Sequence, residues 1–255
     1  IPSRGISEAR WLRVPDGNMQ ILTIVPGGIG STGRAPATLR YFDGQSYAEK
    51  LSQGGDLALG QVLSVSPTGE QIVTLSDGKA LAWTRQEGAP LPKSQGQLKA
   101  QSDEPLSVVF SPTGSLLATG GRRGEVILYD VKQGFAPFAL TSHQGAVRTL
   151  QFSPDGKLLA SGSADGSARL YDTDTHKLVS TMSGHSGEVR AVQFSGEGSR
   201  LLVLDSGERA WLRDGRDGKL VAALAKHSTK EYAAIAMSPD GTRIAFCGDE
   251  LRIWD

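Results

Sequence analysis

Short apolar runs separated by polar turns recur along the chain. Residues 147–152 (VRTLQF) and 189–194 (VRAVQF) are two such runs, and each is followed by a turn and then by a second apolar run. Runs of β-branched and aliphatic residues that are bounded by Gly, Pro and Asp predict β-strands. No stretch combines a helical period with capping residues, so the pattern predicts an all-β protein.

The turns between the first two runs repeat at a nearly constant interval. Four of them read Ser-Pro-Asp/Thr-Gly, beginning at Ser66, Ser111, Ser153 and Ser238, and a degenerate copy begins at Ser195. The successive intervals are 45, 42, 42 and 43 residues. A fixed period of about 40–45 residues predicts a radial array of small sheets, because one such unit cannot bury both of its faces alone.

Each repeat predicts four strands, and the third strand ends in a recognisable pair of residues. These pairs are Phe42-Asp43, Trp83-Thr84, Tyr129-Asp130, Tyr171-Asp172, Arg213-Asp214 and Trp254-Asp255. We expect one domain over residues 1–255, because six repeats of about 42 residues fill the chain. The six repeats lie at about residues 1–55, 56–100, 101–142, 143–184, 185–226 and 227–255.

The chain resembles a WD40-repeat β-propeller over nearly all of its length, most strongly from Glu104 to Asp255. The resemblance rests on Gly184-His185 before a first strand, on the Ser-Pro-Asp-Gly turns, and on the Trp-Asp or Tyr-Asp pairs. It implies four-stranded antiparallel blades around a central channel, with the outer strand of the last blade supplied by the N-terminus. We expect six blades. Because the sequence stops after a third strand, either residues 1–7 close the ring or a strand is missing, and a trimmed ring of seven blades is the alternative.

The resemblance also implies a structural hydrogen-bond network within a blade, which links a His, a strand Ser or Thr, a turn Asp and an aromatic residue. The fourth repeat carries such a set: His143, Ser161, Asp165 and Tyr171. In the fifth repeat Gly207 replaces the turn Asp and Arg213 replaces the aromatic residue. We therefore expect the fifth blade to be held mainly by packing.

Three patterns could suggest chemistry. His143, Ser161 and Asp165 have the composition of a hydrolase triad, but a triad is defined by geometry and roles, and their spacing is that of the structural network. Residues 28–34 satisfy G-x-G-x-x-G, yet a strand follows instead of the helix N-terminus that phosphate binding needs, so we expect a flexible loop. Residues 172–176 offer too few carboxylates for calcium. We expect no catalytic residues, no metal and no cofactor.

Charge and cysteine content limit the expected partners and the expected cellular location of the protein. Lys+Arg and Asp+Glu both number 27, so the net charge disfavours nucleic acid or an anionic membrane as a partner. No stretch approaches the length of about 18 apolar residues that a spanning helix needs. Cys247 is the single cysteine and is expected to be a small buried hydrophobe, which fits the reducing cytoplasm. The Arg-, Ala- and Gly-rich composition favours a bacterial origin, and Ile1 favours a chain excised from a longer protein.

Four arginines are the candidate partner-binding residues. Arg148 and Arg190 begin first strands five residues after His143 and His185, and Arg122 and Arg123 lie in a turn of the third repeat. Together they could form a cationic crescent, and arginine suits carboxylates and phosphates because it binds them in a bidentate way. The alternative is that they are solvated or pair with the nearby acids Asp165, Glu188 and Glu208.

The sequence therefore predicts a non-enzymatic interaction scaffold, or a sensor or regulatory domain of a larger protein. Its partner would be a protein or peptide, acidic or phosphorylated. The alternative is a propeller enzyme or small-ligand binder that uses the central channel. That alternative requires acids or histidines on the first strands, whose positions are mostly Val, Ala, Leu and Thr.

Overall fold

The structure is a computed structural model of the chain. It describes residues 8–13, 19–25, 29–30, 33–34, 38–43, 49–53, 61–76, 78–85, 93–100, 105–207, 209–224, 234–247 and 251–254. Side chains are described from Ser64 onward, except at residues 76, 234–235, 246–247 and 251–252. Within these ranges the chain forms strands and turns and no helix, as the apolar pattern predicted. Residue contacts group the chain into two compact parts, residues 1–99 and residues 100–255. The expected single domain stays a prediction, and the two parts are described separately.

The first part holds two four-stranded antiparallel sheets. One sheet has the order β1-β2-β5-β6 and consists of β1 (Glu8–Arg13), β2 (Met19–Val25), β5 (Thr38–Asp43) and β6 (Glu49–Gln53). The other has the order β7-β8-β9-β10 and consists of β7 (Gln61–Val65), β8 (Gln71–Ser76), β9 (Lys79–Thr84) and β10 (Lys93–Gln97). In the second sheet strands adjacent in sequence pair, whereas in the first β2 pairs with β5 and the short strands β3 and β4 lie between them in the sequence.

The glycine-rich segment of residues 28–34 lies between β2 and β5. Part of it forms a short hairpin, in which β3 (Ile29–Gly30) pairs with β4 (Gly33–Arg34). The expectation of a flexible loop is therefore corrected, because two residue pairs form a ladder there. The next described element is strand β5, so the described residues place no helix N-terminus after these glycines.

The second part holds three four-stranded antiparallel sheets and one three-stranded sheet, all of them meanders. The third repeat forms β11 (Pro105–Phe110), β12 (Leu116–Gly121), β13 (Val126–Asp130) and β14 (Ala136–Ala139). The fourth forms β15 (Val147–Phe152), β16 (Leu158–Ser163), β17 (Ala168–Asp172) and β18 (Leu178–Met182). The fifth forms β19 (Val189–Phe194), β20 (Arg200–Asp205), β21 (Ala210–Asp214) and β22 (Leu220–Leu224). The sixth forms β23 (Ala234–Met237), β24 (Ile244–Cys247) and β25 (Leu251–Trp254).

The repeated serine turns connect the first and second strands by one mechanism. In each of five turns the serine hydroxyl accepts a hydrogen bond from the backbone N–H five residues later, as Ser153 Oγ does from Leu158 N at 2.9 Å. The turn glycine, for example Gly156 with φ 73°, adopts the left-handed conformation that glycine tolerates best. The degenerate copy at Ser195 makes the same turn, so its loss of Pro and Asp does not change the connection.

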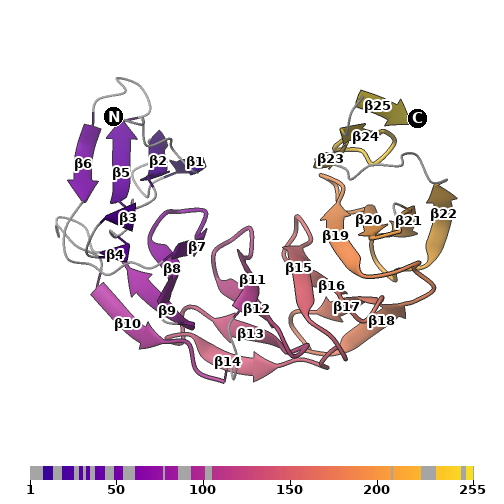
Figure 1. Ribbon diagram of the computed structural model, residues 1–255, viewed down its shortest axis with the longest axis horizontal. Helices are drawn as coiled ribbons and strands as arrows, with labels where there is room; N and C mark the ends of the chain where they lie inside the picture. The colour runs from indigo at the N-terminus through magenta and orange to yellow at the C-terminus, as the bar shows by residue number, and fades with distance from the viewer. Residues whose placement is uncertain are drawn as a thin grey trace. The chain divides into compact units, whose positions relative to one another are not determined.

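In the second part, the first strands of successive sheets lie side by side, with β15 between β11 and β19, and β19 followed by β23 (Figure 1). Gly120 on β12 and Gly162 on β16 allow the close approach of the next sheet. A Cβ added at these positions would lie 2.5 Å from a methyl group of Val147 and of Val189, respectively. The sheets therefore bury one another's faces in pairs, as the period predicted.

The junction between the fifth and sixth repeats is built differently. Leu204 pairs with Ala191 as Gly162 pairs with Thr149, so a large side chain stands where the two preceding sheets have glycine. Leu204 packs in an apolar cluster with Ile244 of β24. Side-chain packing here replaces the close backbone approach of the other junctions.

A side-chain hydrogen bond also distinguishes these junctions. Gln151 on β15 accepts a hydrogen bond from Phe194 N on β19, with an Oε1–N distance of 2.6 Å. Gln193 stands 42 residues later at the same register, and its buried Oε1 has no partner within the described part of the chain. The two glutamines therefore make different contacts although they share a register.

These antiparallel sheets are consistent with propeller blades, and strands β5, β9, β13, β17 and β21 end at the residue pairs that the sequence indicated. The number of blades and the closure of a ring stay predictions.

Candidate functional site

A β-bulge presents an additional side chain at the start of the first strands β15 and β19. In β15, Val147 pairs with Ser163 and Thr149 pairs with Gly162, so Arg148 is the extra residue. In β19 the same irregularity makes Arg190 the extra residue. A bulge re-aims its extra side chain out of the regular alternation. Both arginines are exposed although they lie on strands that are otherwise packed between sheets.

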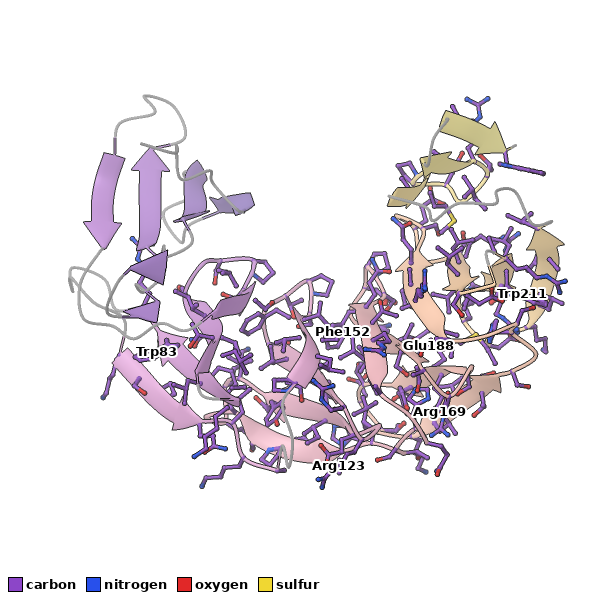
Figure 2. All side chains as sticks on the ribbon, viewed as in Figure 1. Trp83, Arg123, Phe152, Arg169, Glu188 and Trp211 are labelled. Atoms are coloured by element: carbon purple, nitrogen blue, oxygen red, sulfur yellow. The ribbon has the colours of Figure 1, made fainter. Side chains whose placement is uncertain are left out.

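Arg122 and Arg123 lie in the loop between β12 and β13, and both are exposed. This loop contacts the segment that leads into β15, because His143 N donates a 2.9 Å hydrogen bond to Gly124 O. The pairing of Val147 with the last residue of β16 places the start of β15 at the corresponding end of its own sheet. The structure therefore brings the four predicted arginines to one end of the sheets of the second part, and Figure 2 labels Arg123.

The acids near these arginines are partly engaged with them. Arg148 Nε lies 3.4 Å from Glu188 Oε2, and both side chains are 44% exposed. Arg122, Arg123 and Arg190 also take part in interactions. Asp165, another of the three candidate acids, is hydrogen-bonded to His143 of its own repeat. Glu208 lies outside the described residues. Ion pairs at such exposed positions contribute little to stability, about 0–1 kcal/mol, so Arg148 can exchange partners at low cost.

The predicted structural network of the fourth repeat is assembled around a buried histidine. His143 Nε2 lies 2.7 Å from Ser161 Oγ, and His143 Nδ1 lies 3.1 Å from Asp165 Oδ2. Asp165 also accepts hydrogen bonds from Gln144 N at 2.9 Å and from the Ser167 hydroxyl at 2.7 Å. The hydroxyl of Tyr171 donates to Thr141 O at 2.8 Å.

Burial and hydrogen bonding determine the charges in this network. Burial lowers the pKa of His143 in spite of the nearby Asp165 carboxylate, so the imidazole is neutral at pH 7. Burial opposes ionisation of Asp165 too, but the hydrogen bonds from Ser167 and Gln144 lower its pKa to about 2. The neutral imidazole then donates from Nδ1 to the carboxylate and accepts from Ser161 at Nε2. Since Ser161 has no exposed surface and His143 is 2% exposed, these residues cannot meet a substrate as a hydrolase triad would.

The fifth repeat contains a network that the sequence did not predict. Asp205, at the end of β20 and 2% exposed, accepts hydrogen bonds from Ser186 N (2.9 Å), Arg209 N (3.1 Å) and the indole of Trp211 (3.0 Å). Burial opposes its ionisation, but these donors hold the pKa of Asp205 below its ordinary value. The expectation that packing mainly holds this blade did not include this hydrogen-bond network. The acidic residue of this network lies two positions before Gly207, which stands where the repeat pattern has its turn Asp.

Arg213 takes over one function of the aromatic residue that it replaces. It is 7% exposed, and its guanidinium donates to Gly218 O at 3.1 Å and to Ser183 O at 3.4 Å. Ser183 stands 42 residues after Thr141, the carbonyl that accepts from Tyr171 in the fourth repeat. A long cation thus reaches the same backbone carbonyl as a phenol hydroxyl does.

Position 203 lacks the hydroxyl that earlier repeats carry at this register of the second strand. Thr74 accepts a 2.9 Å hydrogen bond from the indole of Trp83, and Ser161 donates to His143 Nε2 at 2.7 Å. The fifth repeat has Val203 at this register. His185 there donates from Nδ1 to Gly166 O at 2.9 Å and leaves its buried Nε2 without a partner in the described structure.

The remaining candidate residues for metal binding or chemistry are Asp172 and Cys247. Asp172 Oδ1 accepts three hydrogen bonds, from Asp174 N, Thr175 N and the Thr175 hydroxyl, which occupy it as a turn residue. Cys247 lies on β24, and its side chain is outside the described residues. The described residues contain no cluster of His, Cys, Asp and Glu that could hold a metal ion. They also contain no helix long and apolar enough to cross a membrane.

The antiparallel sheets, the serine turns and the His143 network define a β-repeat protein, and within the second part successive sheets pack face to face. Residues 92–130, 137–172 and 176–207 match the family described as WD domain, G-beta repeat. These three segments, within residues 92–207, are therefore WD40 repeats, as the motifs indicated. No curated protein matches the chain.

Proposed function

We propose that this chain is a non-enzymatic recognition module that binds an acidic or phosphorylated segment of a partner protein. One observation carries the proposal: two successive first strands use the same bulge to present an exposed arginine, Arg148 and then Arg190. Arginine forks bind carboxylates and phosphates with well-defined geometry. Arg122 and Arg123 extend the cationic surface at the same end of the sheets. WD40 repeats generally mediate binding between proteins, which supports the proposal.

The proposed module acts as a scaffold or a regulatory domain, in the reducing cytoplasm and of bacterial origin, within a longer protein or complex. We also propose that its sheets are the blades of a six-bladed ring. Ile253 on β25 is 64% exposed, whereas Leu128 and Leu170, at the same register of β13 and β17, are fully buried beside a fourth strand. This difference supports a ring in which a further strand covers β25. A crystal structure with an open stack of sheets, or with seven blades, would contradict that part of the proposal.

The arginine surface is tested by reversing its charge. The double variant Arg148→Glu/Arg190→Glu should lose at least 10-fold in capture of acidic and phosphorylated peptides from an immobilised random-peptide array, because two attractive contacts become repulsive. Its circular dichroism and urea midpoint should equal those of the unchanged protein, since both side chains are exposed. The matched control is Lys132→Glu/Arg216→Glu, which makes the same charge change in exposed turns at the opposite end of β13 and β21. Equal capture by the two double variants would contradict the proposal.

A further inference from the structure

Glu188 is an acidic residue at the cationic surface. It directly precedes β19 and stands two residues before the bulge residue Arg190, and its carboxylate lies 3.4 Å from Arg148 across the junction of two sheets. Its backbone is held in place, because Glu188 O accepts a 2.7 Å hydrogen bond from Ser206 N in the loop after β20. Glu188 thus lies 3.4 Å from Arg148 and two residues before Arg190 in the chain, and we call these three residues of alternating charge the charge row (Figure 2 labels Glu188).

The carboxylate of Glu188 can bind a second cation in addition to Arg148. Oε2 faces the Arg148 guanidinium, while the side chain keeps 44% of its surface exposed. A carboxylate offers about four acceptor sites on two oxygens, so a second cation can bind while Arg148 stays nearby. A purely acidic partner would bring its charge against Glu188, whereas a partner with a central cation would turn this repulsion into attraction.

We propose that the charge row selects a partner segment whose charges alternate as acidic, basic, acidic. This inference rests on the proposed function, and it assigns Glu188 as the residue that determines which acidic segments bind. Neighbouring sheets pack about 10 Å apart, which sets the scale of the row. In an extended peptide, residues i, i+2 and i+4 share one face and span about 13 Å, so they match this scale. The acidic positions can be Asp, Glu or a phosphorylated residue, and the basic position is Lys or Arg.

Synthetic peptides with acids at i and i+4 test the assignment. One carries Lys at i+2, the second carries Gln there, and both are titrated at low salt with fluorescence anisotropy. The unchanged protein should bind the Lys peptide about three- to five-fold more tightly, which is the range of an exposed ion pair. The variant Glu188→Gln should remove this preference, so that the two affinities agree within twofold. The matched control Glu197→Gln, an exposed acid in the turn at the other end of β19, should keep it.

The outcomes separate this inference from the proposed function. Binding of both peptides with equal affinity to the unchanged protein would overturn the role of Glu188 and leave the arginine surface in place. A preference for the Lys peptide that survives in Glu188→Gln would also overturn it. Failure of both peptides, and of their phosphoserine versions, to bind would overturn the proposed function itself.

Discussion

Two glutamines at the same register of neighbouring repeats should respond oppositely to the same substitution. Gln151 Oε1 accepts from Phe194 N at 2.6 Å, and Phe194 is 6% exposed. Replacing Gln151 with Met keeps the length of the side chain but removes the acceptor, which leaves a buried N–H without a partner. That loss costs about 1–3 kcal/mol. Gln193 has a buried Oε1 with no partner in the described structure, so Gln193→Met removes a desolvated polar atom and no bond.

We expect Gln151→Met to lower the free energy of unfolding by about 2 kcal/mol and Gln193→Met to leave it unchanged or raise it by up to about 1 kcal/mol. Urea unfolding at 25 °C, followed by tryptophan fluorescence and by circular dichroism, measures both variants. For a part of this size, a difference of about 2 kcal/mol also separates the melting temperatures by about 4–8 °C. Equal destabilisation by the two substitutions, or a larger loss for Gln193→Met, would refute the reasoning that only Gln151 accepts a hydrogen bond across its junction.

Two further predictions concern the networks around the histidines. Val203→Thr supplies a hydroxyl at the register of Ser161, where His185 Nε2 is buried without a partner, so it should stabilise the protein by about 0.5–1.5 kcal/mol in urea unfolding. The control Val192→Thr, which buries a hydroxyl elsewhere on the neighbouring strand β19, should destabilise, and equal losses in both variants would exclude the bond. The second prediction concerns pH. Because burial lowers the pKa of His143, the unfolded chain binds a proton more readily, and stability present above about pH 6.5 is lost as the pH falls toward 5. The Asp165 carboxylate, whose pKa is about 2, adds a second loss only as the pH falls through about 4 toward 2. Urea unfolding at pH 7, 6 and 5 should show a weaker dependence in His143→Gln, and an unchanged slope would contradict a neutral, buried imidazole.

The local sequence was sufficient for the strands, the turns and the repeat. A serine, a glycine with positive φ and a following strand lie within six residues, so the turn at Ser195 could be predicted even though its motif is degenerate. The His143 network could be predicted for the same reason, since its members recur at the spacing of a known repeat. The network around Asp205 could not, because the acid moved by two residues and only the fold brings Ser186 N and Trp211 to it. The signal that could have found it was an acid ending an otherwise apolar second strand.

The sequence alone determined the sheet of each repeat. Apolar alternation and turn residues act within one repeat, so they do not depend on the neighbouring repeats. The tertiary structure decided everything that joins repeats. A bulge exposes Arg148 on a packed strand, the junction of two sheets brings Glu188 to within 3.4 Å of it, and the same junction gives Gln151 its hydrogen bond to Phe194 N. The last two contacts link residues about 40 positions apart, and their existence depends on how closely two sheets approach. That distance is set by the packing of both faces together, which no single run of residues contains.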